Sequence, residues 1–191
     1  GRDYRSPNAK PDGPDKTLWG ADQLHWLKTT LRKSDAAFRF LISPTPLVGP
    51  DRASKRDNHT NPRGFRHERD RFFEWLERTG LIGNGFFILC GDRHWQYHAI
   101  HPSGVEEFSC GALVDANAIP GTFPGTPGST DPEGQIRQPF HPRRASGGFL
   151  CVTVPAAAPA TAPTAEFRFC DEKGSTLYSV DRQARRTDPV P

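Results

Sequence analysis

The chain has 191 residues, a length that suits one domain or part of a larger one. Hydrophobic residues make up only 35% of it, and 18 glycines and 19 prolines indicate many loops, yet 13 phenylalanines and 4 tryptophans can still build a core. The net charge of +3 is small, and lysines and arginines are scattered among acids, so we expect no nucleic-acid-binding face. No run of about 18 apolar residues occurs, so we expect no membrane-spanning segment.

The chain opens on Gly1 without a signal-peptide pattern, and it contains no methionine. We therefore expect a piece of a longer protein: a processed product, a fragment or one part of a split chain. The four cysteines show no Cys-x-x-Cys spacing and lie in or beside strand-like segments, at Cys90, Cys110, Cys151 and Cys170. Because a free cysteine packs as a small apolar residue, we favour buried thiols over disulfides, and the compartment stays open.

Helical and extended patterns alternate between residues 20 and 90. Apolar residues recur at steps of three and four in two segments, which predicts amphipathic helices. The expected order is a helix over 20–33, a strand over 37–43, a helix over 65–79 and a strand over 85–90. This alternation predicts an α/β arrangement in which the two strands are parallel neighbours.

The second half of the chain has a different pattern. Short alternating segments predict a hairpin over 96–110, a strand over 148–154 and a second hairpin over 166–181. The stretch from 111 to 146 is rich in glycine and proline and lacks periodicity, so it is expected to be a long loop. Residues 183–191 are basic and rich in proline, and they are expected to form a frayed tail.

The most informative stretch begins with the apolar run Phe86–Cys90, which predicts a strand buried on both faces. Gly91 permits a sharp turn after it, and Asp92 and His94 follow two positions apart. Ligands collect at the carboxyl ends of such strands, and a carboxylate with an imidazole suits Zn, Fe or Mn. The alternative is that Gly-Asp is ordinary turn sequence and His94 a surface residue.

A second polar group, Asp57-Asn58-His59, lies in the loop between a predicted strand and helix. Two oxygens and a nitrogen could serve a pair of metals, although Asp and Asn also favour loops for their own hydrogen bonds. His98 lies within a predicted strand and is interpreted as a polar strand residue rather than a ligand. Neither a Gly-x-Ser-x-Gly nor a phosphate-binding Gly-x-x-x-x-Gly-Lys motif is present, which disfavours serine hydrolases and nucleoside triphosphatases.

Three motifs occur in a characteristic order: Thr17–Leu27, then Asp57–Asn61 with Phe65–Arg69, then Cys90–Tyr97. Together they resemble the C-terminal half of alkaline phosphatase D-like (PhoD-like) proteins of the calcineurin-type metallophosphatase superfamily. The segments Phe108–Gly111 and Ser146–Leu150 are similar to the same family. The resemblance covers residues 1–182, which would be the C-terminal portion of such a domain, with 183–191 as a flexible tail.

The resemblance implies an α/β fold: part of a four-layer α-β-β-α sandwich with a mixed sheet and flanking helices. It also implies two divalent or trivalent metal ions (Fe, Zn, Mn or Ca) that hydrolyse phosphate monoesters or diesters. Asp92 and His94 match the last metal-binding motif, His59 is the best match for an earlier histidine, and Asn58 or Asp57 could assist it. Two metals about 3.5–4 Å apart activate a water and polarise the phosphoryl oxygens. Catalytic and substrate-binding side chains are not assigned.

The N-terminal half of that domain, which normally supplies most of the metal ligands, is not in this sequence. We therefore expect the chain to work with that half, joined covalently or supplied by another chain. The resemblance suggests a periplasmic or secreted protein. Two alternatives stay open: a non-catalytic binding or structural module on the same fold, and a different hydrolase or oxidase with one metal held by His59, Asp92 and His94.

Overall fold

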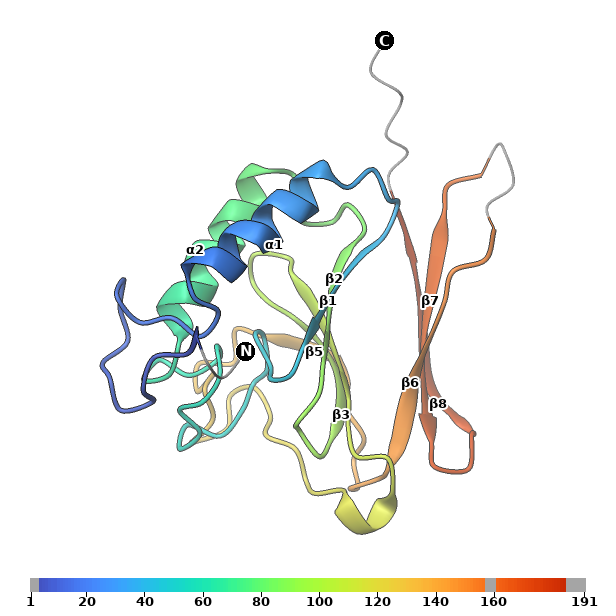
Figure 1. The fold of residues 1–191 in the computed structure, drawn as a ribbon. Coiled ribbons are helices and arrows are strands. Elements are labelled where there is room, and N and C mark those ends of the chain that lie inside the picture. Colours follow the sequence, from blue (N-terminus) through green and yellow to red (C-terminus); the bar gives the residue numbers. More distant parts are fainter. Residues whose placement is uncertain (1–3, 157–160, 185–191) are drawn as a thin grey trace.

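The computed structural model describes residues 4–156 and 161–184. Two helices and eight strands form within these residues (Figure 1), and their bounds are α1 (Ala21–Lys33), β1 (Arg39–Ser43), α2 (Arg66–Arg78), β2 (Phe86–Cys90), β3 (Gln96–Ile100), β4 (Glu106–Cys110), β5 (Arg137–Phe140), β6 (Gly148–Thr153), β7 (Thr164–Asp171) and β8 (Thr176–Gln183). A five-stranded sheet has the order β1-β2-β4-β3-β5, and a three-stranded sheet has the order β6-β7-β8. The helices lie on one side of the larger sheet and the smaller sheet lies on the other.

The larger sheet is mixed. β1 and β2 are parallel neighbours, as the sequence predicts, with Arg39 opposite Phe86 and Ser43 opposite Cys90. β2 is also parallel to β4, whereas β3 is antiparallel to β4 and to β5. β2 therefore has a partner on each side, and its carboxyl end opens in the same direction as those of β1 and β4.

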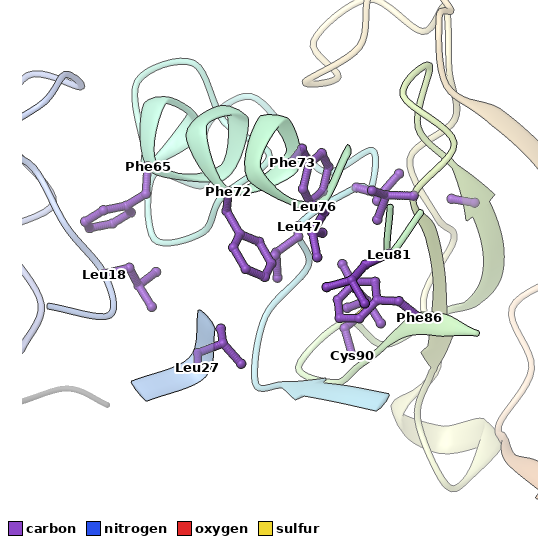
Figure 2. Packing of buried hydrophobic residues seen from close by; sticks show 14 of the residues in the cluster. Leu18, Leu27, Leu47, Phe65, Phe72, Phe73, Leu76, Leu81, Phe86 and Cys90 are labelled. Carbon is purple, nitrogen blue, oxygen red and sulfur yellow. The ribbon is translucent and has the colours of Figure 1, made fainter. Parts of the chain in front are cut away.

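The first core lies between the helices and the larger sheet. Figure 2 shows Phe72 and Leu76 of α2 directed towards Phe86 and Cys90 of β2. Phe72 and Leu76 are fully buried, and they lie four residues apart, one turn along the same helical face. The amphipathic helix predicted from the apolar periodicity is thus confirmed. Its buried face packs on β2 and holds that strand in place beneath α2.

The second core lies between the two sheets. Phe108 of β4 and Phe167 of β7 stack almost parallel, with ring centroids 4.1 Å apart, and both are fully buried. On the other face of Phe108 the imidazole of His98 stacks at 4.3 Å. His98 is therefore a strand residue, as interpreted from the sequence, and the structure shows in addition that it is fully buried.

The expected mixed α/β fold with flanking helices is confirmed. The described residues supply three successive layers, helices and then two sheets, and within them no helix covers the outer face of the β6-β7-β8 sheet. Nor is any helix in this part of the chain long and apolar enough to cross a membrane. All four cysteines are free thiols; Cys90 and Cys170 are buried, and the other two are half-buried.

The interpretation of residues 111–146 as an irregular loop was wrong in part. A short 3-10 turn forms over Asp115–Asn117, and β5 pairs with β3 at the edge of the sheet. β5 has the sequence Arg-Gln-Pro-Phe, and proline is tolerated in an edge strand because its missing N–H need not join a ladder. The expected tail lies outside the described residues from 185 onwards, and β8 continues to Gln183.

A polar contact also ties the two sheets together. His98 Nε2 donates to Glu106 Oε2 over 2.7 Å, and Arg182 of β8 reaches both oxygens of the same carboxylate. Burial on its own would raise the pKa of Glu106, but the hydrogen bonds from His98 and Arg182 outweigh it and lower that pKa. The ionised carboxylate is thus the form that the folded protein favours.

We predict that Phe167→Ala lowers the free energy of unfolding by about 3–5 kcal/mol, because it removes a fully buried ring that packs on Phe108 and Phe87 and leaves a cavity between the two sheets. Urea unfolding followed by circular dichroism measures this change. Phe149→Ala is the matched control: Phe149 lies on the outer face of the same small sheet and is 41% exposed, so its loss should cost about 1 kcal/mol or less. Equal losses in the two variants would contradict the assignment of this core.

We further predict that Glu106→Gln destabilises the protein near neutral pH and that the difference from the wild type shrinks in acid. The folded pKa of Glu106 is depressed, so its contribution is complete above the ordinary value of 4.5 and is lost as the pH falls through the lower folded pKa. Urea unfolding at several pH values tests this. A difference that stays constant from neutral pH to well below 4.5 would count against it.

Candidate functional site

A pocket of about 290 Å³ opens at the carboxyl end of β2. Its walls are formed by Asp51, Arg52, Lys55, Asp57, Asp92, Arg93, His94, Trp95 and Ile119. Three carboxylates, three cations and one imidazole therefore face one space. The structure thus brings Asp92 and His94 together at the strand end, where the sequence places them.

Asp92 has a left-handed backbone, with φ of 63°, and it is the one such non-glycine residue among those described. Aspartate tolerates this conformation better than most residues, but the conformation still costs energy and is found where surrounding structure enforces it. The conformation turns the chain directly after β2. The Asp92 side chain is 53% exposed, so its carboxylate is available to a ligand in the pocket.

His94 has its imidazole orientation fixed by one hydrogen bond. Its Nδ1 lies 2.8 Å from the carbonyl oxygen of Asn117, and since a carbonyl can only accept, Nδ1 carries the proton. In the neutral ring the lone pair then lies on Nε2. A metal-binding histidine has the same arrangement, in which one ring nitrogen donates to a carbonyl and the other is left for the metal.

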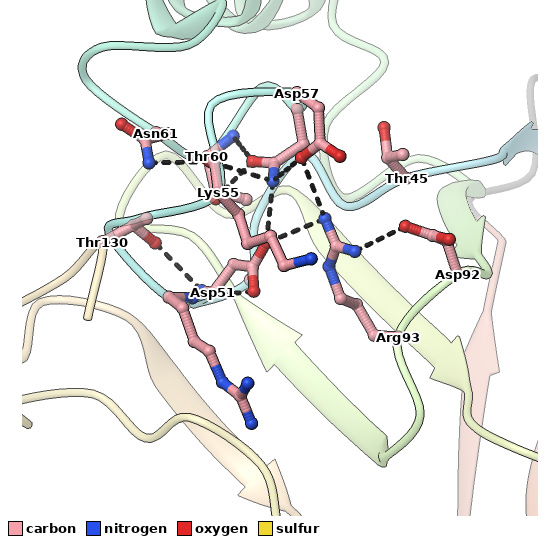
Figure 3. A network of polar contacts seen from close by, with 12 residues as sticks. Thr45, Asp51, Lys55, Asp57, Thr60, Asn61, Asp92, Arg93 and Thr130 are labelled. Atoms are coloured by element: carbon pink, nitrogen blue, oxygen red, sulfur yellow. Dashed lines mark hydrogen bonds and ion pairs between the residues drawn. The ribbon is translucent and has the colours of Figure 1, made fainter. Parts of the chain in front are cut away.

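Arg93 lies between these two residues in sequence and is almost completely buried. Figure 3 shows its guanidinium among three carboxylates. Nη2 lies 2.8 Å from Asp51 and 3.5 Å from Asp57, and Nη1 pairs with Asp92. Burial raises the pKa of Asp51, and the Arg93 charge opposes this only in part. One cation therefore holds together two acids of the loop between β1 and α2 and the acid that follows β2.

The loop that carries Asp51 is fixed by a buried carboxylate of the sheet. Glu107 of β4 is fully buried and accepts hydrogen bonds from the backbone amides of Leu47, Val48 and Gly49 over 2.6, 3.0 and 2.8 Å. The hydroxyl of Tyr97 donates to the same carboxylate over 2.8 Å. Burial raises the pKa of Glu107, although the three amides oppose that rise. The sheet thereby positions Asp51, which lies shortly after Gly49 in the same loop.

Asn58 is fully buried beneath the pocket and supports its acids. Its amide donates to Asp51 Oδ2 over 2.7 Å, and its carbonyl oxygen accepts from the backbone and hydroxyl of Thr60. Asn58 does not line the pocket that contains Asp92 and His94. The metal-ligand role predicted for Asn58 stays a prediction, and its observed contacts are those of a residue that holds Asp51 in place.

His59 is also fully buried and does not line that pocket. Its Nε2 lies 2.8 Å from Glu68, and its ring packs against Trp19 at 4.4 Å. Burial alone would raise the pKa of Glu68, but hydrogen bonds from His59, Thr17 and Leu18 lower it, so the carboxylate is ionised and Nε2 donates. Nδ1 is left without a hydrogen-bond partner among the described residues. A metal would bind that nitrogen, so the ligand role of His59 also stays a prediction.

The polar residues that the sequence analysis missed are Asp51, Arg52, Lys55 and Arg93. Within residues 4–156 and 161–184, no three His, Cys, Asp or Glu side chains are grouped closely enough to hold a metal ion together. Asp92 and His94 thus provide a carboxylate and a correctly oriented imidazole for part of a metal site. All three acids of the pocket, Asp92 included, are paired with Arg93.

The comparisons with known proteins identify the family and the fold of this chain. The two-sheet fold is similar to that of a solved structure described as "Structure of PhoD", which matches with a TM-score of 0.53 at 17% identity. The sequence model of the PhoD-like phosphatase family matches residues 1–142, and the chain belongs to that family. The match to the PhoD structure covers 97% of this chain but 41% of that one, so the chain spans less than half of its length. The comparison with curated proteins gave no match.

We predict that Glu107→Gln lowers the free energy of unfolding by about 2–4 kcal/mol, because a side-chain amide cannot accept from three backbone N–H groups at once. Chemical unfolding measures the loss. Glu133→Gln is the control, since Glu133 is exposed in the loop before β5 and its replacement should cost no more than about 0.5 kcal/mol. A similarly small effect at Glu107 would show that the loop before Asp51 does not depend on this carboxylate.

Proposed function

We propose that this chain is the C-terminal part of a metal-dependent phosphoesterase that hydrolyses phosphate monoesters or diesters. The observation that carries the proposal is the placement of Asp92 and His94 in one pocket at the end of β2, with the His94 ring oriented by Asn117. Membership of the PhoD-like phosphatase family supports the same reaction class.

Asp92 would hold a metal through its carboxylate and His94 through Nε2. Bound metal would supply a hydroxide from water at neutral pH and polarise the phosphoryl oxygens. Hydrolysis breaks the P–O bond to the leaving group, the oxygen of water replaces it on phosphorus, and a proton ends on the leaving oxygen. The residues described here suffice for part of a metal centre, so ligands from outside them are required for two metals.

The cations of the pocket would bind the phosphate itself. Arg52 and Lys55 are exposed at its edge, and Arg93 lies buried in its wall. A phosphate ester carries its charge on oxygens that a guanidinium can contact with two N–H groups. Arg93 also neutralises the acids of the pocket, and this favours the approach of an anionic substrate to a site that contains three carboxylates.

We propose that the missing ligands come from an N-terminal half of the same domain, joined covalently or supplied by another chain. The length covered in the PhoD structure supports this proposal, as does the outer face of the small sheet, which the described residues leave without a helical layer. Family membership further supports export to the periplasm or cell exterior. The isolated 191-residue chain should therefore hydrolyse p-nitrophenyl phosphate far more slowly than the complete natural protein that contains it.

The sharpest test replaces the two predicted ligands in the complete natural protein. Asp92→Asn and His94→Ala should each lower kcat/KM for p-nitrophenyl phosphate and bis(p-nitrophenyl) phosphate by about 100-fold or more, because the metal is misplaced or lost. Metal content, measured by plasma mass spectrometry on the same samples, should fall with activity. His25→Ala is the control, because His25 is exposed on α1 away from the pocket.

The same measurements separate the alternatives. A protein without bound metal or turnover would favour a binding or structural module on this fold. One metal per chain, lost together with Asp92 or His94, would favour a mononuclear hydrolase. Full activity in both ligand variants would remove the proposed centre altogether.

A further inference from the structure

A second pocket, of about 260 Å³, lies directly beside the first. Trp95 and Ile119 line both pockets, so these two side chains form the wall that they share. The remaining lining residues are Gln96, Pro120, Gly121, Phe123, His141, Pro142, Arg143, Arg144 and Ala145. A molecule bound in the first pocket would therefore reach the second only past the side chains of Trp95 and Ile119.

The shared wall is built from defined contacts. Ile119 donates its backbone N–H to the carbonyl of His94 over 3.0 Å, and the carbonyl of Asn117 accepts from the ring of the same histidine. Gly121 packs closely on the indole of Trp95: a Cβ at position 121 would lie 2.7 Å from Cδ1 of that ring. The segment that divides the two pockets is thus tied to the predicted metal ligand His94.

The two pockets differ in chemistry. The first contains three carboxylates and three cations, whereas the described residues bring no carboxylate to the second, which is lined by the two exposed arginines Arg143 and Arg144. Its other walls are largely apolar, and the ring of Phe123 contacts that of His141 with centroids 4.4 Å apart. Apolar walls with positive charge at the edge suit a flat hydrophobic group that bears a negative charge.

Two buried polar atoms in the second pocket's wall add a second observation. Trp95 Nε1 and Gln96 Oε1 are buried, and neither has a hydrogen-bond partner in the described part of the chain. The amide nitrogen of Gln96 donates to the carbonyls of Cys170 and Phe149. These two bonds identify Oε1 as the end of the amide that is without a partner. Buried polar groups normally have partners, so the one donor and one acceptor without them in this wall are exceptions among the described residues.

We propose that the second pocket receives the leaving group of the phosphate ester, and that it favours an aromatic leaving group carrying an additional negative charge. The proposal rests on the proposed function, because it places the phosphate in the first pocket. Trp95, Ile119 and Phe123 contact the ring, and Arg143 and Arg144 attract the second charge. An ester with a small neutral alcohol gains none of these contacts.

The test compares ethyl, phenyl and 4-carboxyphenyl phosphate as substrates of the complete natural protein. The wild-type preference for the carboxylated over the plain phenyl ester should fall about three- to tenfold in Arg143→Gln/Arg144→Gln. The preference for phenyl over ethyl ester should fall about two- to tenfold in Phe123→Ala. Intrinsic reactivities of the esters cancel, because each ratio is compared between a variant and the wild type.

The control for charge is Arg32→Gln/Arg78→Gln, which removes the same two charges from exposed helix positions outside this pocket. A parallel experiment measures binding of phenylphosphonate and 4-phosphonobenzoate by calorimetry, since their P–C bonds cannot be hydrolysed. The carboxylated ligand should bind more tightly to the wild type and to the control, and this advantage should fall in Arg143→Gln/Arg144→Gln.

The outcomes distinguish the two proposals. Hydrolysis of all three esters with ratios unchanged in both pocket variants would overturn the leaving-group pocket and leave the phosphoesterase intact. Equal falls in the control and in Arg143→Gln/Arg144→Gln would also overturn it, because net charge alone would then explain the preference. Selective phosphonate binding without hydrolysis of any ester would overturn the phosphoesterase and, with it, the assignment of the bound ring as a leaving group.

Discussion

The arrangement of the site depends on one buried carboxylate. Glu107 has no contact with solvent, and it accepts hydrogen bonds from three consecutive amides of the loop before Asp51. A desolvated carboxylate is unfavourable unless it is surrounded by donors, so the sheet and the loop can be stable only in this mutual position. Through Asp51 the same constraint reaches Arg93, and through Arg93 it reaches Asp92. A residue of the sheet interior thereby determines where the acids of a surface pocket lie.

Local patterns in the sequence were enough for most of the fold. The helices, the parallel pairing of β1 with β2 and both hairpins follow from periodicity, turn residues and chain order, all of which act over a few neighbouring residues. Asp92 and His94 could be found for the same reason, because they follow a strand directly. β5 could not be found, since it is short, contains a proline and exists only because β3 offers it an edge.

The remainder of the site could not be predicted because its contacts join distant parts of the chain. The ion pair between Asp51 and Arg93 can form only once the sheet has brought the two residues together. The sequence around each residue contains no pattern that predicts this pairing. Glu107 follows another glutamate in a hairpin strand and resembles a solvent-facing residue. For His59 the sequence context suggests a ligand, which stays a prediction, but it does not reveal that the fold buries the ring against Trp19 and pairs it with Glu68.

The left-handed backbone at Asp92 limits which amino acids can replace the aspartate without strain. Glycine, asparagine, aspartate and histidine enter that region most readily, and β-branched residues are largely excluded. Of these, only aspartate combines a negative charge with an oxygen donor on a short side chain. A protein that keeps this turn can therefore carry histidine, which offers a nitrogen donor, or asparagine, which keeps an oxygen donor without the charge. A glutamate at this position would strain the turn or require a different backbone.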